Sequence, residues 1–318
     1  MSVPDTTVLL AKVEDPVGTW ANPVPATDAM LVFDYEVEPM EAEQVRRQVE
    51  RPFSGVAESS YTAIRARHRF SVELAGSGTV DTPTFWARLL RGCMFQTPDI
   101  TATEKVTYPL VPASDGAAIS LAGNKGNARH RGRMSRGNAV LRFTEKQLPS
   151  IGFDFMSLIE GTLPMDPFAP SGVVLPSYPV PAEVSLLNTA IQLDGFALGV
   201  RSLEIDLGNK VEFYSHTGTR AVLFGKDDSG DRRSVTARAV FELPDPAVKN
   251  FFASILPRTK LPFSLVHGTD AGNIIEITSA AAVIGQATYS VEQNRMFMNC
   301  PIEFVPTAGG NELSLVTR

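Results

Sequence analysis

The stretch of sequence that decides the fold reads GNAVLRF at residues 137–143 and continues, after a turn, as IGFDF at residues 151–155. A similar pattern returns as GQATYSV at residues 285–291, followed by PIEF at residues 301–304. This alignment makes Phe155 of the first copy equivalent to Phe304 of the second. Two copies of one β-rich pattern indicate an internal duplication, which is typical of proteins that assemble symmetrically.

The segments upstream of these stretches support the same duplication. The strand pattern RFSVEL at residues 69–74 and a helix started by Pro83 have counterparts in AVFEL at residues 239–243 and a helix at Pro246. Strands of a hairpin follow each helix. The order of strand, helix, hairpin and closing strands is therefore the same in both halves.

The clearest single strand reads IRARHRFSVEL at residues 64–74. Apolar residues and His68 alternate there with arginine, serine and glutamate, which predicts a strand with one buried and one solvated face. Residues 41–49 are ambiguous, because Glu43 and Arg47 have helical spacing but no capping residue begins a helix. We interpret that segment as a loop or a short helix.

Each half carries one predicted helix. Pro83 can occupy the first turn of a helix that presents an apolar stripe made of Phe85, Trp86, Leu89, Leu90 and Cys93. Its counterpart runs from Pro246 through Ile255 and ends before Pro257. The chain is therefore predicted to be mainly β, an α+β protein of two tandem β-sandwich or half-barrel units with one flanking helix each.

The length of 318 residues suits two domains, each large enough for a core of its own. Prolines divide the chain. Residues 1–29 are predicted to be an extended N-terminal arm, residues 30–163 the first unit, residues 164–181 a proline-rich linker and residues 182–318 the second unit.

The net charge of −6 argues against a basic surface spread over the whole molecule for nucleic-acid binding. No apolar stretch approaches the length of a membrane span, and the N-terminus lacks the pattern of a signal peptide. We expect folding in a cytoplasm. Cys93 and Cys300 are interpreted as small buried hydrophobic residues rather than as a disulfide or a zinc site.

The search for catalytic chemistry is negative. The sequence contains no phosphate-binding glycine loop and no HExxH motif, and its four histidines lack the spacing of metal ligands. The acidic run DDSGD at residues 227–231 lacks the closing glutamate of a calcium loop, so it is predicted to be an exposed hairpin tip. We expect no enzyme activity, no cofactor and no bound metal.

One cluster of positive charge lies among glycines between residues 123 and 137. Glycine-rich basic loops can bind phosphate, but the cluster lacks interleaved aromatic residues for base stacking. We favour contact with an acidic surface on a neighbouring copy. The cluster consists of Lys125, Arg129, His130, Arg131, Arg133 and Arg136.

Several segments together resemble the major tail tube proteins of long-tailed, non-contractile bacteriophages. They read ERPFSG at residues 50–55, VELAGSG at 72–78, LLRGCMF at 89–95 and MSRGNAV at 134–140, and IGFDF at 151–155 is similar to the closing strand of that family. The resemblance covers residues 30–160, and the second half enters as the repeat.

This resemblance implies β-sandwich or half-barrel units that join their sheets into rings of six, so a two-unit chain would need three copies per ring. Such rings stack around a tape-measure protein, between tail terminator and distal tail proteins. The lumen lets double-stranded DNA pass during genome ejection. The protein would be a virion component assembled in the host cytoplasm.

The resemblance also implies two sets of functional residues. An acidic or neutral lumen wall would not bind phosphate, and its candidate acids on solvated strand faces are Glu73, Asp154, Glu204, Asp206, Glu242 and Glu303. Contacts between subunits or rings are expected from the N-terminal arm, the basic cluster and a hairpin near residues 226–233. The candidates in that hairpin are Asp227, Asp228, Arg232 and Arg233.

Two alternatives remain at this point. One is a tube component of a contractile tail or secretion system, although those subunits usually have a single unit. The other is a two-domain carbohydrate-binding or adhesive module, which would need an exposed aromatic platform. An enzyme is the last alternative.

Overall fold

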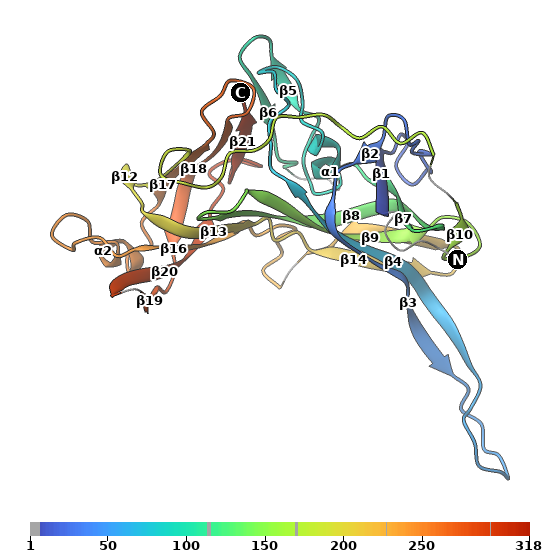
Figure 1. Ribbon diagram of the computed structural model, residues 1–318. Helices are drawn as coiled ribbons and strands as arrows, with labels where there is room; N and C mark the ends of the chain where they lie inside the picture. The colour runs from blue at the N-terminus through green and yellow to red at the C-terminus, as the bar shows by residue number, and fades with distance from the viewer. Residues whose placement is uncertain (1–6, 113–115, 169–170, 227, 293) are drawn as a thin grey trace.

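The computed structural model describes residues 7–112, 116–168, 171–226, 228–292 and 294–318. It confirms a mainly β protein whose strands form two layers around a shared core. The layer that we call the wall sheet is curled like a segment of a barrel (Figure 1). Its strands lie in the order β3 (Phe33–Arg46), β4 (Ser59–Glu73), β9 (Ser150–Ile159), β8 (Ala128–Thr144), β13 (Val200–Asp206), β16 (Thr236–Glu242), β20 (Arg295–Phe304) and β19 (Thr288–Glu292).

The second layer covers the other side of the core. It is joined to the wall sheet where β7 pairs with β8 and β18 pairs with β20. One group of its strands is β2 (Ala29–Met30), β1 (Thr7–Val13) and β7 (Ile119–Lys125). The other is β12 (Phe196–Ala197), β11 (Thr189–Leu193), β17 (Leu261–His267), β18 (Ile275–Ile284), β21 (Ser314–Thr317), β6 (Lys105–Tyr108) and β5 (Asp99–Thr101).

The wall sheet shows the duplication directly. The order β3-β4-β9-β8 is followed by β13-β16-β20-β19, and equivalent backbone bonds occur in both halves. Leu74 donates its N–H to Pro149 at 2.9 Å, as Leu243 does to Met296 at 2.9 Å. This register makes Phe155 equivalent to Ile302, two residues from the alignment with Phe304 that the sequence suggested.

The two halves are joined into one wall. Strand β8 is the last wall strand of the first half, and β13 is the first wall strand of the second. These two strands pair with each other, and the paired residues run from Thr144 with Ser202 to Val140 with Asp206. The buried side chains of both halves form one continuous hydrophobic cluster that includes Phe143, Phe155 and Phe241. The length had suggested separate cores, but the pairing of β8 with β13 leaves no solvated boundary between them.

The two helices are shorter than predicted. Helix α1 spans Ala87–Arg91 and α2 spans Phe252–Ile255. Of the predicted apolar stripe, Leu89 and Leu90 lie in α1 and are buried, and Trp86, just before it, is fully buried with its indole N–H donating to the Ala75 carbonyl at 2.9 Å. Gly92 follows α1 at a point where a Cβ would lie 2.9 Å from Phe155, so close packing on the wall sheet accompanies the end of the helix.

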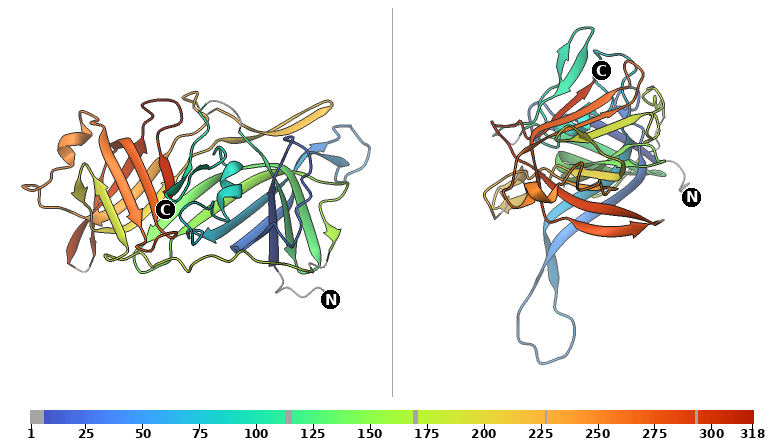
Figure 2. Two further views of the ribbon diagram at one scale, coloured as in Figure 1. Left: turned by 90° about the horizontal axis from the view of Figure 1, so that it is seen from above. Right: turned by 90° about the vertical axis from the view of Figure 1, so that its left-hand side faces the viewer.

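Two segments differ from the sequence-based expectation. The expected arm contributes β1, which pairs along its length with β7 and buries Leu9 and Leu10, so this segment is packed; residues 1–6 lie outside the described residues. Residues 41–46, expected as loop or short helix, continue β3. Strands β3 and β4 then form a long hairpin that projects from the body (Figures 1 and 2).

Two smaller elements contact the wall sheet. Strand β10 (Asp166–Pro167) pairs with the start of β8. Strands β14 (Val211–His216) and β15 (Thr219–Phe224) form a separate hairpin. This hairpin is held to the wall sheet where Arg136 donates to the Val222 carbonyl at 2.8 Å and Arg65 lies 5.4 Å from the Phe213 ring centroid.

Candidate functional site

The surface of the wall sheet opposite the core is polar, and we call it the polar face. It arises because side chains alternate along β4, β9, β13, β16 and β20, with one set buried and the next half-buried or exposed. All six acids assigned to the lumen by resemblance lie on this face, although they come from five different strands. They are Glu73, Asp154, Glu204, Asp206, Glu242 and Glu303.

The polar face carries paired charges rather than a bare acidic surface. Asp154 accepts two bonds from Arg67, at 2.6 and 2.5 Å, and lies 3.5 Å from Arg69. The hydrogen bond to Asp154 raises the pKa of Arg67, so this guanidinium stays charged. Three more pairs have the same character: Arg142 with Glu204 at 3.8 Å, Arg295 with Glu242 at 2.5 Å and Arg258 with Glu303 at 2.6 Å.

The other two acids have neutral partners. Asn138 donates to Asp206 at 2.6 Å, and the Tyr178 hydroxyl donates to Glu73 at 3.2 Å. Burial, followed by the charge of Glu73, raises the pKa of Tyr178, so its hydroxyl stays protonated. The geometry therefore gives every predicted wall acid a defined partner, which fixes the charge pattern of this face.

The basic cluster is bound within the chain. Arg129 and Arg131 both contact Asp166, the latter at 3.4 Å, and the hydrogen bond from Arg129 lowers the pKa of Asp166. Arg133 pairs with Glu160 at 3.0 Å. The acidic surface that we expected on a neighbouring copy is thus supplied, for these three arginines, by the same chain.

Two further members of the basic cluster behave differently. Arg136 is buried beneath the β14–β15 hairpin, where it donates to the Val222 carbonyl. Lys125 is exposed at the end of β7, with its ammonium 5.7 Å from the Tyr35 ring centroid. Lys125 therefore has the exposure that a contact between copies requires, whereas Arg136 joins two parts of one chain.

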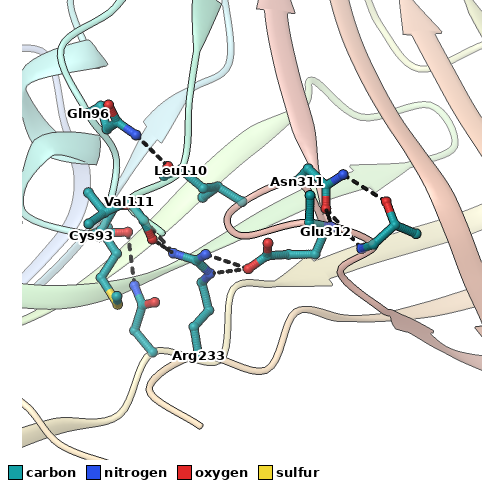
Figure 3. A network of polar contacts seen from close by, with 11 residues as sticks. Cys93, Gln96, Leu110, Val111, Arg233, Asn311 and Glu312 are labelled. Atoms are coloured by element: carbon teal, nitrogen blue, oxygen red, sulfur yellow. Dashed lines mark hydrogen bonds and ion pairs between the residues drawn. The ribbon is translucent and has the colours of Figure 1, made fainter. Parts of the chain in front are cut away.

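Arg233, in the hairpin tip expected near residues 226–233, forms a buried ion pair with Glu312. The side chains of Arg233 and Glu312 are only 6% and 8% exposed, and the Arg233 Nε lies 2.6 Å from the carboxylate (Figure 3). The same guanidinium donates to the carbonyls of Val111 at 3.3 Å and Met94 at 3.5 Å. Arg233 therefore ties loops of the first half to the second half, which differs from the expected contact between subunits.

The neighbours of Arg233 in the sequence are nearer the surface. Asp228 is exposed and Arg232 is half-buried, while Asp227 lies outside the described residues. Asn209, which forms a β-bridge with Arg233, donates to the carbonyls of Cys93 at 3.0 Å and Gly137 at 3.1 Å. These bonds make the Arg233 network a junction between the two halves.

A buried polar pair stabilises the hairpin end of the wall. His68 is fully buried in β4, and its Nδ1 lies 3.0 Å from the Tyr35 hydroxyl on β3. Burial, with a smaller effect of His130, lowers the pKa of His68 to about 3. His68 is therefore neutral near pH 7 and serves as part of the core.

Among the described residues, no group of three or more histidine, cysteine or acidic side chains has the arrangement of a metal site. The two cysteines are buried and free, and burial raises the pKa of Cys300 to about 12 and that of Cys93 as well. Within the described part of the chain, no helix has the length and apolar character needed to cross a membrane.

The sequence interpretation missed two features of the surface. One is the β3–β4 hairpin, whose outer part exposes apolar side chains: Val45, Val49, Phe53, Val56 and Tyr61. The other is that the wall sheet ends in β3 on one side and β19 on the other, each paired on one side only among the described strands. In the sequence, the hairpin and the two edge strands are marked only by apolar residues within segments that are otherwise polar.

A curled β wall with a polar face, whose two outer strands are each paired on one side only among the described strands, is typical of a structural subunit that assembles with further copies. Residues 4–306 match the family described as phage tail tube protein, and the chain belongs to this family. No curated protein matched the chain. The protein is therefore a structural component of a phage tail tube, and the family is one of structural proteins rather than enzymes.

Proposed function

We propose that three copies of this chain join edge to edge into a ring and that such rings stack into a tube that conducts viral DNA. The observation that supports this proposal is the wall sheet, in which one strand order occurs twice and neither outer edge is paired with another described strand. Closure of the sheet on itself satisfies those edges. Barrels of roughly 16–18 strands already leave an aqueous channel, and three wall sheets of this kind contain more strands.

The building blocks of the ring would be the two units of each chain. We propose residues 30–163 and residues 182–318 as these units, with residues 164–181 as the linker. The strand order supports the division, because each unit contributes four consecutive wall strands. Within residues 1–29, β1 completes the outer layer of the first unit.

The polar face would line the lumen. DNA passes through a channel most readily when the wall offers no band of unneutralised cations, since these release counterions from phosphate and bind it. Most wall arginines with a defined partner contact a wall acid, as Arg67 and Arg142 do. The wall would therefore present alternating paired charges to the DNA.

The β3–β4 hairpin would hold successive rings together. Strands of a closed barrel are tilted from its axis, so a hairpin that continues two wall strands beyond the body leaves through one end of the ring. Its tip exposes Phe53 and Val56, which are 65% and 89% exposed and contribute apolar surface for a neighbouring copy. Lys125, Asp228 and Arg232 remain further candidates for contacts between copies.

The other partners follow from the family. A tube of this kind would assemble around a tape-measure protein in the host cytoplasm, between a terminator and a distal tail protein. Double-stranded DNA would pass through it transiently and without sequence preference.

The test is electron microscopy of the purified protein over a range of concentrations, together with immunogold labelling of the virus particle. We expect rings or tubes at high concentration and gold particles along the tail. Monomers at every concentration, together with unlabelled tails, would contradict the proposal.

A further inference from the structure

The internal junction between β8 and β13 indicates how two copies of the chain meet. We infer that β19 of one copy pairs in antiparallel orientation with β3 of the next copy, in the register of the internal junction. This inference rests on the proposed ring. It adds to that ring the identity of the two edges, their orientation and their register.

Strands of the two units occupy equivalent places in the wall sheet. Strand β8 is the last wall strand of the first unit, and β19 holds the same place in the second unit. Strand β13 begins the second unit as β3 begins the first. Since β8 pairs with β13 inside the chain, the edge that continues this pattern between chains joins β19 to β3.

Strand β19 exposes apolar side chains. Tyr289 and Val291 lie on the core-facing side of β19, opposite Met298 and Met296 of β20, yet they are 52% and 67% exposed. The equivalent residues of β8 are Leu141 and Phe143, which are 1% and 0% exposed beside β13. The edge thus exposes apolar side chains at the positions that the internal junction buries.

The opposite edge shows the complementary pattern. Val37 of β3 pairs with His68, as Ile205 of β13 pairs with Ala237, so Val37 is equivalent to Ile205. Ile205 is fully buried by the internal junction, whereas Val37 is half-buried. A second copy of β19 beside β3 would cover Val37 with Tyr289.

The register follows from these equivalences. Inside the chain, Glu204 lies opposite Arg142, and Ile205 lies opposite Leu141. Glu36 is equivalent to Glu204, because both are paired with an arginine of the next wall strand, Arg69 or Arg238. The junction between copies therefore places Glu36 opposite Ser290 and Val37 opposite Tyr289.

Cysteine cross-linking of the full chain tests this register. Directly opposed residues of antiparallel strands have Cα atoms about 4.5–5.5 Å apart, within the range of a disulfide. We expect mild oxidation of assembled Glu36→Cys/Ser290→Cys protein to give covalent oligomers up to the trimer on a non-reducing gel. A mixture of the two single variants should stop at the dimer. The native protein is the blank, because Cys93 and Cys300 are buried.

The matched control is Glu36→Cys/Tyr289→Cys, in which a shift of one residue places the thiols on opposite faces of the sheet. We expect it to lose at least nine-tenths of the cross-linked product. Equal cross-linking of the two pairs, or tubes of Glu36→Cys/Ser290→Cys that do not cross-link, would overturn the assigned register. Tubes seen by electron microscopy in that case would leave the proposed function standing.

A second variant tests the assigned edge without a disulfide. We expect Val291→Lys to abolish rings and tubes at concentrations where the native protein assembles, while its circular dichroism spectrum stays that of the native chain. Val248→Lys is the control, since Val248 is 71% exposed but lies outside the wall sheet. Assembly of Val291→Lys like the control would overturn the inference. Native protein that never assembles would instead contradict the proposed function.

Discussion

At the scale of single residues, the molecule uses arginines in two distinct ways. Those that pair with acids of the polar face form solvated pairs, such as Arg258 with Glu303, whose side chains are 61% and 51% exposed. Arg233 instead forms a buried pair with Glu312 and donates to two carbonyls. Solvated pairs contribute little to stability, whereas the loss of one partner of a buried pair leaves an uncompensated charge.

This contrast gives a prediction for folding stability. We expect Glu312→Ala to lower the free energy of unfolding by about 3–5 kcal/mol, because the Arg233 guanidinium would stay buried without its counter-ion. The matched control Glu303→Ala removes an exposed partner and should cost at most about 1 kcal/mol. Urea unfolding of unassembled chains measures both. Equal losses would show that the Arg233 network does not hold the two halves together.

His68 gives a prediction for pH dependence. Its pKa falls from about 6.5 in the unfolded chain to about 3 in the folded one, so the unfolded chain binds the additional proton between these values. The contribution of His68 is complete above pH 6.5 and declines as the pH falls towards 3. We expect a loss of about 2 kcal/mol between pH 7 and pH 5.

Urea unfolding at pH 7 and pH 5 measures this loss. The variant His68→Gln cannot titrate, so its stability should change less over this range than that of the native protein. His216→Gln is the control, since His216 is exposed on the β14–β15 hairpin. A native pH dependence in the His68→Gln variant would rule out His68 as its source.

At the scale of secondary-structure elements, the sequence predicts those features that depend on the local alternation of apolar and polar residues. Strand β4 and the buried side of each wall strand follow from alternation, and so does the shared face of the six acids. The outer half of β3 lacks this alternation. It is a strand because Glu38 pairs with Arg69 and Glu41 with Arg65 across the hairpin, and such contacts are not visible in local sequence.

The contacts of the arginines could not be predicted from local sequence either. The sequence reveals the basic cluster but not that Asp166 and Glu160 return beside it, because β10 and the end of β9 reach β8 only in the folded chain. The burial of Arg136 likewise depends on the β14–β15 hairpin, which comes from the other half. Pairings between distant segments were therefore beyond sequence-based prediction.

The projecting hairpin gives a prediction at this scale. We expect Phe53→Ser/Val56→Ser to leave single rings intact but to shorten or abolish tubes, because the apolar tip would no longer be buried against the next ring. Tube length by electron microscopy and ring mass by sedimentation measure the effect. A control pair, Leu186→Ser/Leu187→Ser, changes equally exposed apolar residues outside the wall sheet. Tubes of native length in the hairpin variant would exclude its role in stacking.

At the scale of the whole molecule, two units share one wall and one core. The internal junction joins both units into one segment of wall, and in the proposed ring the paired charges of its polar face would face the DNA. Assembly would then require only the two edges and the hairpin. The balance of charge on the wall would then decide whether DNA passes or is held.

That balance gives a prediction for DNA binding. Asp154→Asn removes the carboxylate shared by Arg67 and Arg69, so each such chain adds positive charge to the lumen wall. We expect tubes of this variant to retain a short labelled duplex that native tubes do not retain, with binding that weakens steeply as salt rises. Glu276→Gln, which changes a charge in the outer layer, should behave like the native protein. Equal retention by all three would place the polar face outside the lumen.

Cryo-electron microscopy of the assembled tubes, with the symmetry of one ring determined without imposing it, would distinguish the proposed ring from its alternatives. We expect three chains per ring, a closed β wall in which six similar units alternate between first and second copies, and the polar face towards the lumen. A ring of six chains, or a wall built from only one of the two units, would contradict it.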